Sequence, residues 1–168
     1  MSESREPDPQ PRPTRESTGS LALITRDAPE GSAAPGTLYL AQWNLSWRAL
    51  NLVGGHREGG ESFRDCLVRE IGEELGLAEG EDFVVDDVPP VRLEFDAFSD
   101  SAWAPTAYRV EVYHVRLTGE RALARVASNP DNRWVSHAEI LAGRCNDGTH
   151  ISPTTARVVT LIASARTA

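Results

Sequence analysis

The stretch GHREGGESFRDCLVREIGEELGL, residues 55–77, joins a glycine-rich loop to the pattern of an amphipathic helix. Apolar side chains recur every fourth position and so share one helix face: Phe63, Leu67, Ile71 and Leu75. Ser62 suits the N-cap position, and Gly76 suits the position just past the helix end. The sequence therefore predicts a helix over residues 62–75 that packs one face on a core.

Three acids lie beside that apolar face, in the last turns of the predicted helix: Glu70, Glu73 and Glu74. Two carboxylates about 6 Å apart repel by roughly 3 kcal/mol at an effective dielectric of ~20. Arg69 can offset part of this repulsion, and a divalent cation can offset more. Carboxylate oxygens without His or Cys favour Mg²⁺ or Mn²⁺ over Zn²⁺. Taken alone, the acids fit a solvated helix face about as well as a metal site.

From Gly55 the chain reads Gly, five residues, Glu61, seven residues, then Arg-Glu-apolar-any-Glu-Glu-any-Gly-apolar. This spacing resembles the Nudix box, the signature of the Nudix hydrolases, at every defined position of Gly55–Leu77. Outside the box, Val53 stands where the family often has Pro, and Leu50 stands where it often has Trp. Neither departure is at a metal-ligand position of the family.

The resemblance implies an α/β fold, a Nudix-type α/β/α sandwich with a mixed β-sheet. It also implies Mg²⁺-dependent hydrolysis of a diphosphate linkage in a nucleoside diphosphate linked to another moiety, with water attacking phosphorus. Substrates of this type include ADP-ribose, nucleoside triphosphates and nucleotide sugars. The motif does not choose among them, because specificity comes from loops outside the box.

The same resemblance implies roles for the acids. Glu73 and Glu74 correspond to the principal metal ligands. Glu70 corresponds to a further ligand or to the base that activates water, since the family uses it both ways. The backbone carbonyl of Gly54 corresponds to another metal ligand.

Four further box positions correspond to structural roles. Arg69 and Glu61 match the ion pair that fixes the loop to the helix. Gly55 and Gly76 match positions that need backbone conformations other residues disfavour.

Candidate substrate contacts lie outside the acids. His56 and Arg57 follow the glycine pair and could reach phosphates, although solvated loop residues fit equally well. Glu111, on a predicted strand, could supply a further carboxylate, and an exposed strand residue fits at least as well. Asp131 fits a turn residue better than a catalytic one. Three tryptophans could stack on a base, although such residues are more often part of a core: Trp43, Trp47 and Trp103.

Residues 1–18 carry four prolines among charged and small polar residues, which predicts a disordered N-terminal tail. The remainder, 19–168, is expected to form one Nudix hydrolase domain. Runs of apolar and β-branched residues predict strands at 21–26, 38–43, 49–53, 91–98, 106–117 and 133–136. A small helix is predicted around 137–142, and a C-terminal helix is predicted from Pro153 onward, with Ser152 as its N-cap.

The formal net charge of −8 argues against nucleic acid or an anionic membrane surface as the main partner. The expected partner is instead a small-molecule nucleoside diphosphate derivative. The chain contains no lysine, which excludes Schiff-base catalysis by lysine and a P-loop. Its abundant Ala, Gly and Pro indicate a GC-rich, bacterial genome.

The two cysteines, Cys66 and Cys145, are far apart and show no CxxC spacing, which indicates a reducing compartment. The N-terminus has no apolar h-region, so a cytoplasmic protein is expected. Two questions stay open from the sequence. One is whether the protein forms a homodimer. The other is whether the domain turns over a substrate, or instead senses a ligand or binds a partner without catalysis.

Overall fold

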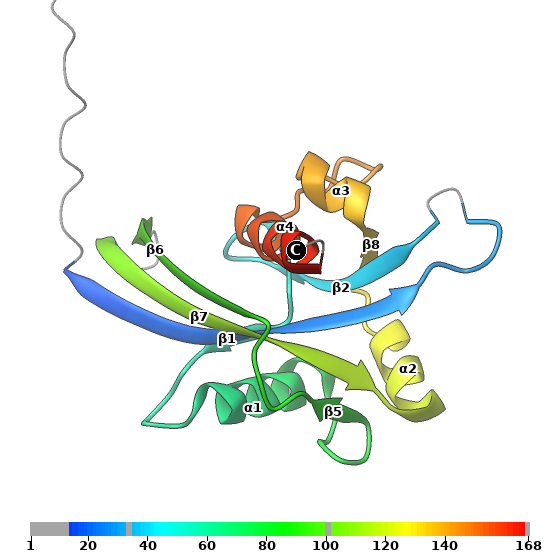
Figure 1. The fold of residues 1–168 in the computed structure, drawn as a ribbon, viewed down its shortest axis with the longest axis horizontal. Coiled ribbons are helices and arrows are strands. Elements are labelled where there is room, and N and C mark those ends of the chain that lie inside the picture. Colours follow the sequence, from blue (N-terminus) through cyan, green and yellow to red (C-terminus); the bar gives the residue numbers. More distant parts are fainter. Residues whose placement is uncertain (1–13, 33–34, 100–101, 167–168) are drawn as a thin grey trace, which may run out of the picture.

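The computed structural model describes residues 14–32, 35–99 and 102–166. A mixed β-sheet forms its middle layer, and helices cover both faces (Figure 1). The expected α/β/α arrangement is therefore confirmed. The strands are β1 (Arg15–Asp27), β2 (Thr37–Asn44), β3 (Ala49–Asn51), β4 (Gly54–His56), β5 (Phe83–Val85), β6 (Val91–Ser99), β7 (Ala104–Leu117) and β8 (Asn132–Ser136). The helices are α1 (Phe63–Leu75), α2 (Gly119–Ser128), α3 (His137–Ala142) and α4 (Pro153–Arg166).

Strand β1 is the centre of the sheet. It pairs in parallel with β7 along most of its length, and antiparallel with β4 and, near its end, with β2. On its outer edge β7 pairs with β5 and β6, and on its outer edge β2 pairs with β8. Strand β3 pairs with the later part of β2, on the edge that faces β1. The pairing of β1 with β4 sets Gly54 opposite Leu21 and Gly55 opposite Ser20. This register decides where the glycine loop begins.

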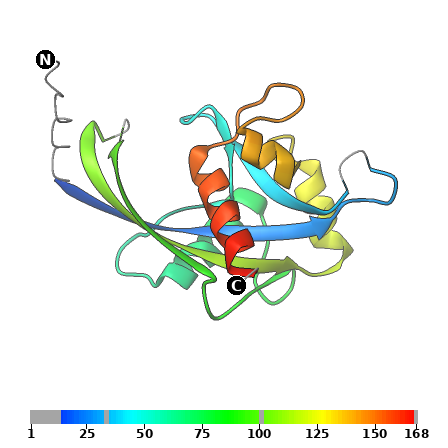
Figure 2. The ribbon, with the colours of Figure 1, turned by 45° about the horizontal axis from the view of Figure 1, so that its top comes forward.

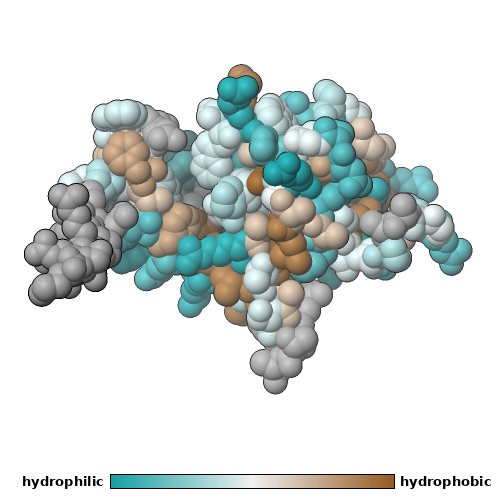
Figure 3. All heavy atoms as spheres, turned by 90° about the horizontal axis from the view of Figure 1, so that it is seen from above, coloured by the Kyte–Doolittle hydropathy of each residue, from teal (hydrophilic) through white to brown (hydrophobic). Residues whose placement is uncertain are grey.

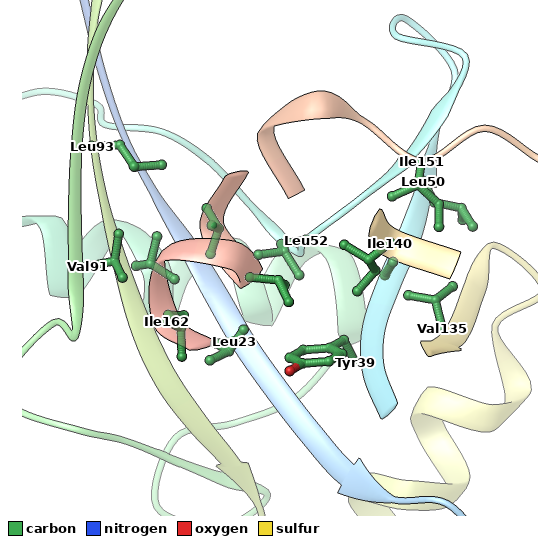
Figure 4. Close-up of a cluster of buried hydrophobic side chains, with 14 of the residues drawn as sticks. Leu23, Tyr39, Leu50, Leu52, Val91, Leu93, Val135, Ile140, Ile151 and Ile162 are labelled. Atoms are coloured by element: carbon green, nitrogen blue, oxygen red, sulfur yellow. The ribbon is translucent and has the colours of Figure 1, made fainter. Parts of the chain in front are cut away.

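Alternation along β1 and β2 divides the apolar side chains between two cores. Leu23 belongs to the core under α3 and α4, which Figure 4 shows in close-up. Ala22 and Ile24, its neighbours in sequence, belong to the core under α1 and α2. The central strands therefore bury both faces, and the helices that cover the two faces are kept apart by the sheet (Figure 2).

The N-terminal part of β1 corrects the predicted tail. Residues 15–18 were expected in a disordered segment, yet their backbone pairs with β7 from Thr106 to Arg109, and Ser17 is buried. Pairing with a long neighbouring strand orders a polar segment that has little apolar surface of its own. The remaining tail residues, 1–13, lie outside the described residues.

Three elements were missing from the sequence-based expectation: β4, β5 and α2. Strand β4 consists of two glycines and a histidine, which read locally as a loop. Helix α2 has no side-chain cap bond at Thr118, although Ala122 and Val126 are buried one turn apart. Among the helices of the described residues, none is both long enough and apolar enough to cross a membrane.

Candidate active site

Helix α1 forms as its end signals predict. The Ser62 hydroxyl accepts a hydrogen bond from the amide of Asp65, which satisfies a free donor of the first turn. Gly76 ends the helix with φ 66°, in the left-handed region, and its amide donates to the carbonyl of Gly72. The predicted apolar face packs against the sheet through Leu67, Ile71 and Leu75. The acids beside that face are thereby held at its edge.

The glycine pair of β4 lies directly against two of these acids. The amide of Gly54 donates to Oε2 of Glu74 over 3.0 Å. A Cβ added to Gly55 would lie 2.7 Å from Oε2 of Glu70, so the Glu70 carboxylate occupies the space a side chain would fill. Gly54 also has φ 139°, and a Cβ there would overlap the backbone of Ser20. Gly54 is therefore required by the backbone, whereas a side chain at Gly55 would displace only the end of the Glu70 side chain.

Arg69 joins the loop to the acids. Its Nη2 and Nε lie 2.8 and 3.2 Å from the two carboxylate oxygens of Glu61, and Nη2 also donates to the carbonyl of His56. Its Nη1 lies 2.9 Å from Glu70 and 3.3 Å from Glu73. The ion pair with Glu61 is present as the box pattern implied. Its contact with Glu73, four residues along the helix, agrees with the expectation that Arg69 offsets part of the repulsion, whereas its contact with Glu70 was not expected.

The charge network shifts the pKa values of its members. The hydrogen bonds from Arg69, and secondarily from the amide of Glu58, lower the pKa of Glu61 to about 2. Burial raises the pKa of Glu74, and the nearby charges of Glu70 and Glu73 raise it further, against the bond from Gly54. The protein's own groups therefore do not fully offset the cost of a negative charge on Glu74.

The donor set fits a hard divalent cation by its chemistry. Glu70 and Glu74 lie against the glycine pair, and Glu73 shares Arg69 with Glu70. A cation bound by these acids would offset the burial and the like charges that raise the pKa of Glu74. Within the described part of the chain, however, no three His, Cys, Asp or Glu side chains are arranged as a ready metal cage. In this network Arg69 contacts one carboxylate oxygen of Glu70 and one of Glu73, so those two oxygens must leave Arg69 before they can coordinate an ion. The predicted ligand role of the Gly54 carbonyl stays a prediction.

The two candidate phosphate contacts differ in their surroundings. The side chain of His56 is exposed, so it can reach a ligand. The guanidinium of Arg57 instead donates to the carbonyl of Glu61 and lies 4.4 Å from the centre of the Phe63 ring. Arg57 therefore helps to fold the loop back onto the start of α1. Its expected role as a phosphate contact stays a prediction.

Glu111 lies on the same face of the sheet as the start of α1. The sheet register places Arg92, Glu111 and Ser20 side by side across three strands. Nε of Arg92 lies 3.0 Å from Glu111, and the hydroxyl of Tyr113 also donates to it. Both Glu111 oxygens thus have partners within the protein, which favours the strand-residue interpretation over substrate binding.

The structure adds residues that the motif could not identify. Gln42 donates to the carbonyl of Glu74 over 3.4 Å and to Oδ1 of Asn132 over 3.0 Å. Asn132 in turn donates to the carbonyl of Val126, at the end of α2. These amides tie the last turns of α1 and α2 to β2 and β8. Each amide lies far from the box in sequence, so only the strand pairing reveals the contact.

Comparison with known proteins agrees with the resemblance of residues 55–77 to the Nudix box. The family model of the NUDIX domain matches residues 13–154. A mutT/nudix family protein from Listeria innocua superposes with a TM-score of 0.60 at 15% identity, covering 94% of this chain and 96% of that chain. The NUDIX hydrolase from Nitrosomonas europaea gives 0.56 at 20% identity, covering 90% of each chain. The Ap4A hydrolase of C. elegans gives 0.56 at 12% identity, covering 88% and 96%.

At these identities the structural similarity shows the fold alone. No curated protein matches the chain in sequence. The family model, however, spans well over half of the chain and includes the whole box. The chain therefore belongs to the Nudix hydrolase family and is a pyrophosphohydrolase.

Proposed function

We propose that this protein hydrolyses a diphosphate linkage in a nucleoside diphosphate joined to another moiety, with Mg²⁺ or Mn²⁺ as cofactor. The observation that carries the proposal is the contact between the acids of α1 and the glycine pair. Glu74 accepts from Gly54, and Glu70 fills the space beside Gly55. The glycine backbone thus lets two carboxylates approach β4 closely, and there they are proposed to hold the ions that meet the phosphate.

Glu73 and Glu74 are the proposed principal ligands, with Glu70 as a third ligand or as the base for the attacking water. A bound divalent ion would neutralise phosphate charge, lower the pKa of the attacking water and stabilise the charge that develops at phosphorus. The protein's own contribution is to hold the acids in defined positions. Glu73, with a side chain 60% exposed, can meet a ligand from solvent, whereas Glu70, 13% exposed, is fixed against β4.

Arg69 and Glu61 keep the loop seated on the helix while the substrate binds. They hold the backbone of residues 56–61 over the middle of α1, so the acids and the loop keep one relative position. A misplacement of about 1 Å in such a site can cost on the order of 100-fold in rate. The brace is thus proposed to act on catalysis through geometry.

The test is a screen for Mg²⁺-dependent phosphate release with ADP-ribose, nucleoside triphosphates, dinucleoside polyphosphates and nucleotide sugars. On any substrate found, Glu73→Gln and Glu74→Gln should lower kcat by about 100-fold or more, beyond the usual effect of losing an outer partner of a metal ligand. The matched control is Glu120→Gln, an exposed acid in the first turn of α2. Mn²⁺ affinity, followed by electron paramagnetic resonance, should fall in the two active-site variants only.

Two results would contradict the proposal. Parent-like hydrolysis by Glu73→Gln and Glu74→Gln would show that the metal ligands are assigned wrongly. Tight binding of a nucleotide under saturating Mg²⁺ with no product would favour a ligand-sensing domain.

A further inference from the structure

Glu74, in the last turn of α1, is held by two different strands through its side chain and its backbone. Its carboxylate accepts from the amide of Gly54 in β4 over 3.0 Å. Its carbonyl accepts from the side-chain amide of Gln42 in β2 over 3.4 Å, a long hydrogen bond. Strands β4 and β2 both pair with β1. Glu74 is therefore fixed to the sheet at two points, and both help to set the direction of its carboxylate.

The carbonyl of Glu74 needs a partner from outside its helix. The last four carbonyls of an α-helix have no amide within the helix to accept from. The amide four residues after Glu74 belongs to Ala78, and it donates to Oδ2 of Asp82 over 3.0 Å. Asp82 is 2% exposed, so the Ala78 amide is bound to a buried carboxylate. Gln42 thus supplies the donor for this end of the helix.

Alternation along β2 directs Gln42 toward α1. Tyr39 and Ala41 belong to the core under α3 and α4, and Trp43 packs against that core. Leu40 belongs to the core under α1 and α2, and Gln42 follows it by two residues and shares its face. Figure 3 views the molecule from the side of α3 and α4, where hydrophobic patches lie among hydrophilic side chains. Gln42 points away from that side.

A second amide holds Gln42 in turn. Asn132 of β8 is the direct cross-strand partner of Gln42, so the two side chains lie on one face of the sheet. Oδ1 of Asn132 accepts from Nε2 of Gln42 over 3.0 Å. Nδ2 of Asn132 donates over 3.0 Å to the carbonyl of Val126, in the last turn of α2. The two amides therefore form a chain of hydrogen bonds from the end of α2 to the end of α1.

The ends of the two helices also meet directly. Nε and Nη2 of Arg125, in the last turn of α2, each lie 3.1 Å from the place that a Cβ on Gly76 would take. Gly76 ends α1 two residues after Glu74. A shift of α2 would therefore displace the same turn that carries Glu74. The amide chain and this contact hold that turn against the sheet and against α2.

The chain of hydrogen bonds needs an amide at both positions. The carbonyls of Glu74 and Val126 only accept, so each must face an NH₂ group. The bond between the two side chains also needs one donor and one acceptor. Glutamine and asparagine carry both kinds of group, whereas an apolar side chain of the same size breaks the chain without adding charge.

We propose that Gln42 and Asn132 are positioning residues for Glu74. Asn132 fixes the amide of Gln42, and Gln42 fixes the last turn of α1. That turn sets how the Glu74 carboxylate meets Gly54 and a bound ion. The inference rests on the proposed role of Glu74 as a metal ligand, but the contact between Glu74 and Gly54 can be followed without metal or substrate.

The test compares Gln42→Met and Asn132→Leu with the parent. The first readout is the Gly54 amide signal in a proton–nitrogen NMR spectrum of the metal-free protein, because its position depends on the bond to the Glu74 carboxylate. The signal should move in both variants. Mn²⁺ affinity, followed by electron paramagnetic resonance, should fall by about tenfold in Gln42→Met, the lower end of the range for an outer partner of a metal ligand. It should fall by about threefold in Asn132→Leu, as for one lost hydrogen bond.

A double variant separates a chain of contacts from two independent contributions. Because Asn132 acts through Gln42, the variant with both substitutions should lose no more Mn²⁺ affinity than Gln42→Met alone. The matched control is Thr118→Val, which removes a hydroxyl that donates to the carbonyl of Glu81 beside the start of α2. It should leave the Gly54 signal and the Mn²⁺ affinity unchanged, even if urea unfolding shows a similar loss of stability.

Three results would overturn the proposal. One is a Gly54 signal at the parent position in the folded single variants. Another is a pair of losses in Mn²⁺ affinity that multiply in the double variant. The third is an equal loss in Thr118→Val, since this would assign the effect to general stability.

Failure of the proposed function would look different. A parent protein that neither binds Mn²⁺ nor hydrolyses any substrate would refute that function, and the Gly54 signal would still decide the positioning role. If Gln42→Met does not fold, Asn132→Leu gives the Gly54 signal and the Mn²⁺ affinity by itself.

Discussion

The guanidinium of Arg69 holds both carboxylate oxygens of Glu61, with Nη2 2.8 Å from Oε1 and Nε 3.2 Å from Oε2. The pair joins the end of the glycine loop to the middle of α1. Because the same guanidinium reaches Glu70 and Glu73, the structural brace and the catalytic acids share one charge network. A substitution of Arg69 or Glu61 should therefore also change the positions of Glu70 and Glu73.

Arg69→Gln should lower kcat/KM by about 10–100-fold, the usual effect of losing an outer partner of a metal ligand. The loop loses its anchor, and Glu70 and Glu73 lose the cation that offsets their repulsion. The control is Arg64→Gln on the same helix, whose ion pair with Glu79 lies away from the acids. Steady-state kinetics and urea unfolding of both variants check this. Equal activity in the two would mean that the brace does not position the acids.

Glu61 should make stability depend on pH in the acid range. Its pKa is about 2 in the folded protein against an ordinary value of 4.5, so the unfolded chain takes up the proton first. The stabilisation is complete above about pH 4.5 and is lost as the pH falls toward 2. The pKa of Asp147 is also lowered to about 2, mainly by its hydrogen bonds with Thr149, so Asp147 contributes to the pH dependence of stability in the same range.

The comparison of parent and Glu61→Gln isolates the share of Glu61, since Asp147 is present in both. The midpoint of urea unfolding should fall less steeply from pH 5 to pH 2 in the variant. Parallel curves for the two proteins would contradict the lowered pKa.

The two glycines of β4 should respond differently to alanine. Gly54→Ala places a Cβ against the backbone of Ser20, at a φ that L-residues rarely adopt, and should destabilise the fold by more than about 2 kcal/mol. Gly55→Ala meets only the end of the Glu70 side chain. It should keep the fold and displace Glu70, with a loss of activity. Circular dichroism, urea unfolding and kinetics check both; a stable, active Gly54→Ala protein would contradict the first expectation.

Glu74→Gln should stabilise the metal-free protein near pH 8 by about 0.5–2 kcal/mol, a common gain for a single stabilising substitution, because it removes a disfavoured charge. Burial and the neighbouring acids raise the pKa of Glu74, so its ionised form is disfavoured in the folded state. A glutamine still accepts the bond from Gly54. The stability difference should shrink as the pH falls through the raised pKa, because Glu74 is then neutral. A variant less stable than the parent in EDTA would contradict this.

Glu111→Gln should change kcat by no more than about threefold and stability by no more than about 1 kcal/mol, the range of a partly exposed ion pair. The amide can still accept from Tyr113 and loses only the pair with Arg92. Arg92→Gln breaks the same pair from the other side and should have the same small effect. A 100-fold loss of kcat in Glu111→Gln alone would identify Glu111 as catalytic.

The box could be interpreted from sequence because its information is local. The apolar spacing of α1, the cap at Ser62 and the terminator at Gly76 act within a few residues of one another, and the structure has all three. The spacing of Glu61 from Arg69 likewise fixes which loop residue can meet which helix residue. Helix periodicity and contacts between residues a few positions apart depend little on the rest of the fold.

The sequence did less well where residues distant in the chain meet. It assigned residues 15–18 to the tail, because their partner is a strand more than eighty residues later along the chain. It left Arg57 open between a phosphate contact and a solvated loop residue, and it did not reveal the contacts of that guanidinium with Glu61 and Phe63. It also missed β4, since two glycines become a strand only when β1 offers them a partner.

The sequence by itself determined the helix, the order of its acids and the family, since these rest on periodicity and fixed spacing. Only the tertiary structure brought Gly55 against Glu70, tied Gln42 to the end of α1, and placed the β2–β3 turn beside α3 and the start of α4. The physical reason is that strand register and helix packing bring together groups whose separation along the chain carries no local signal.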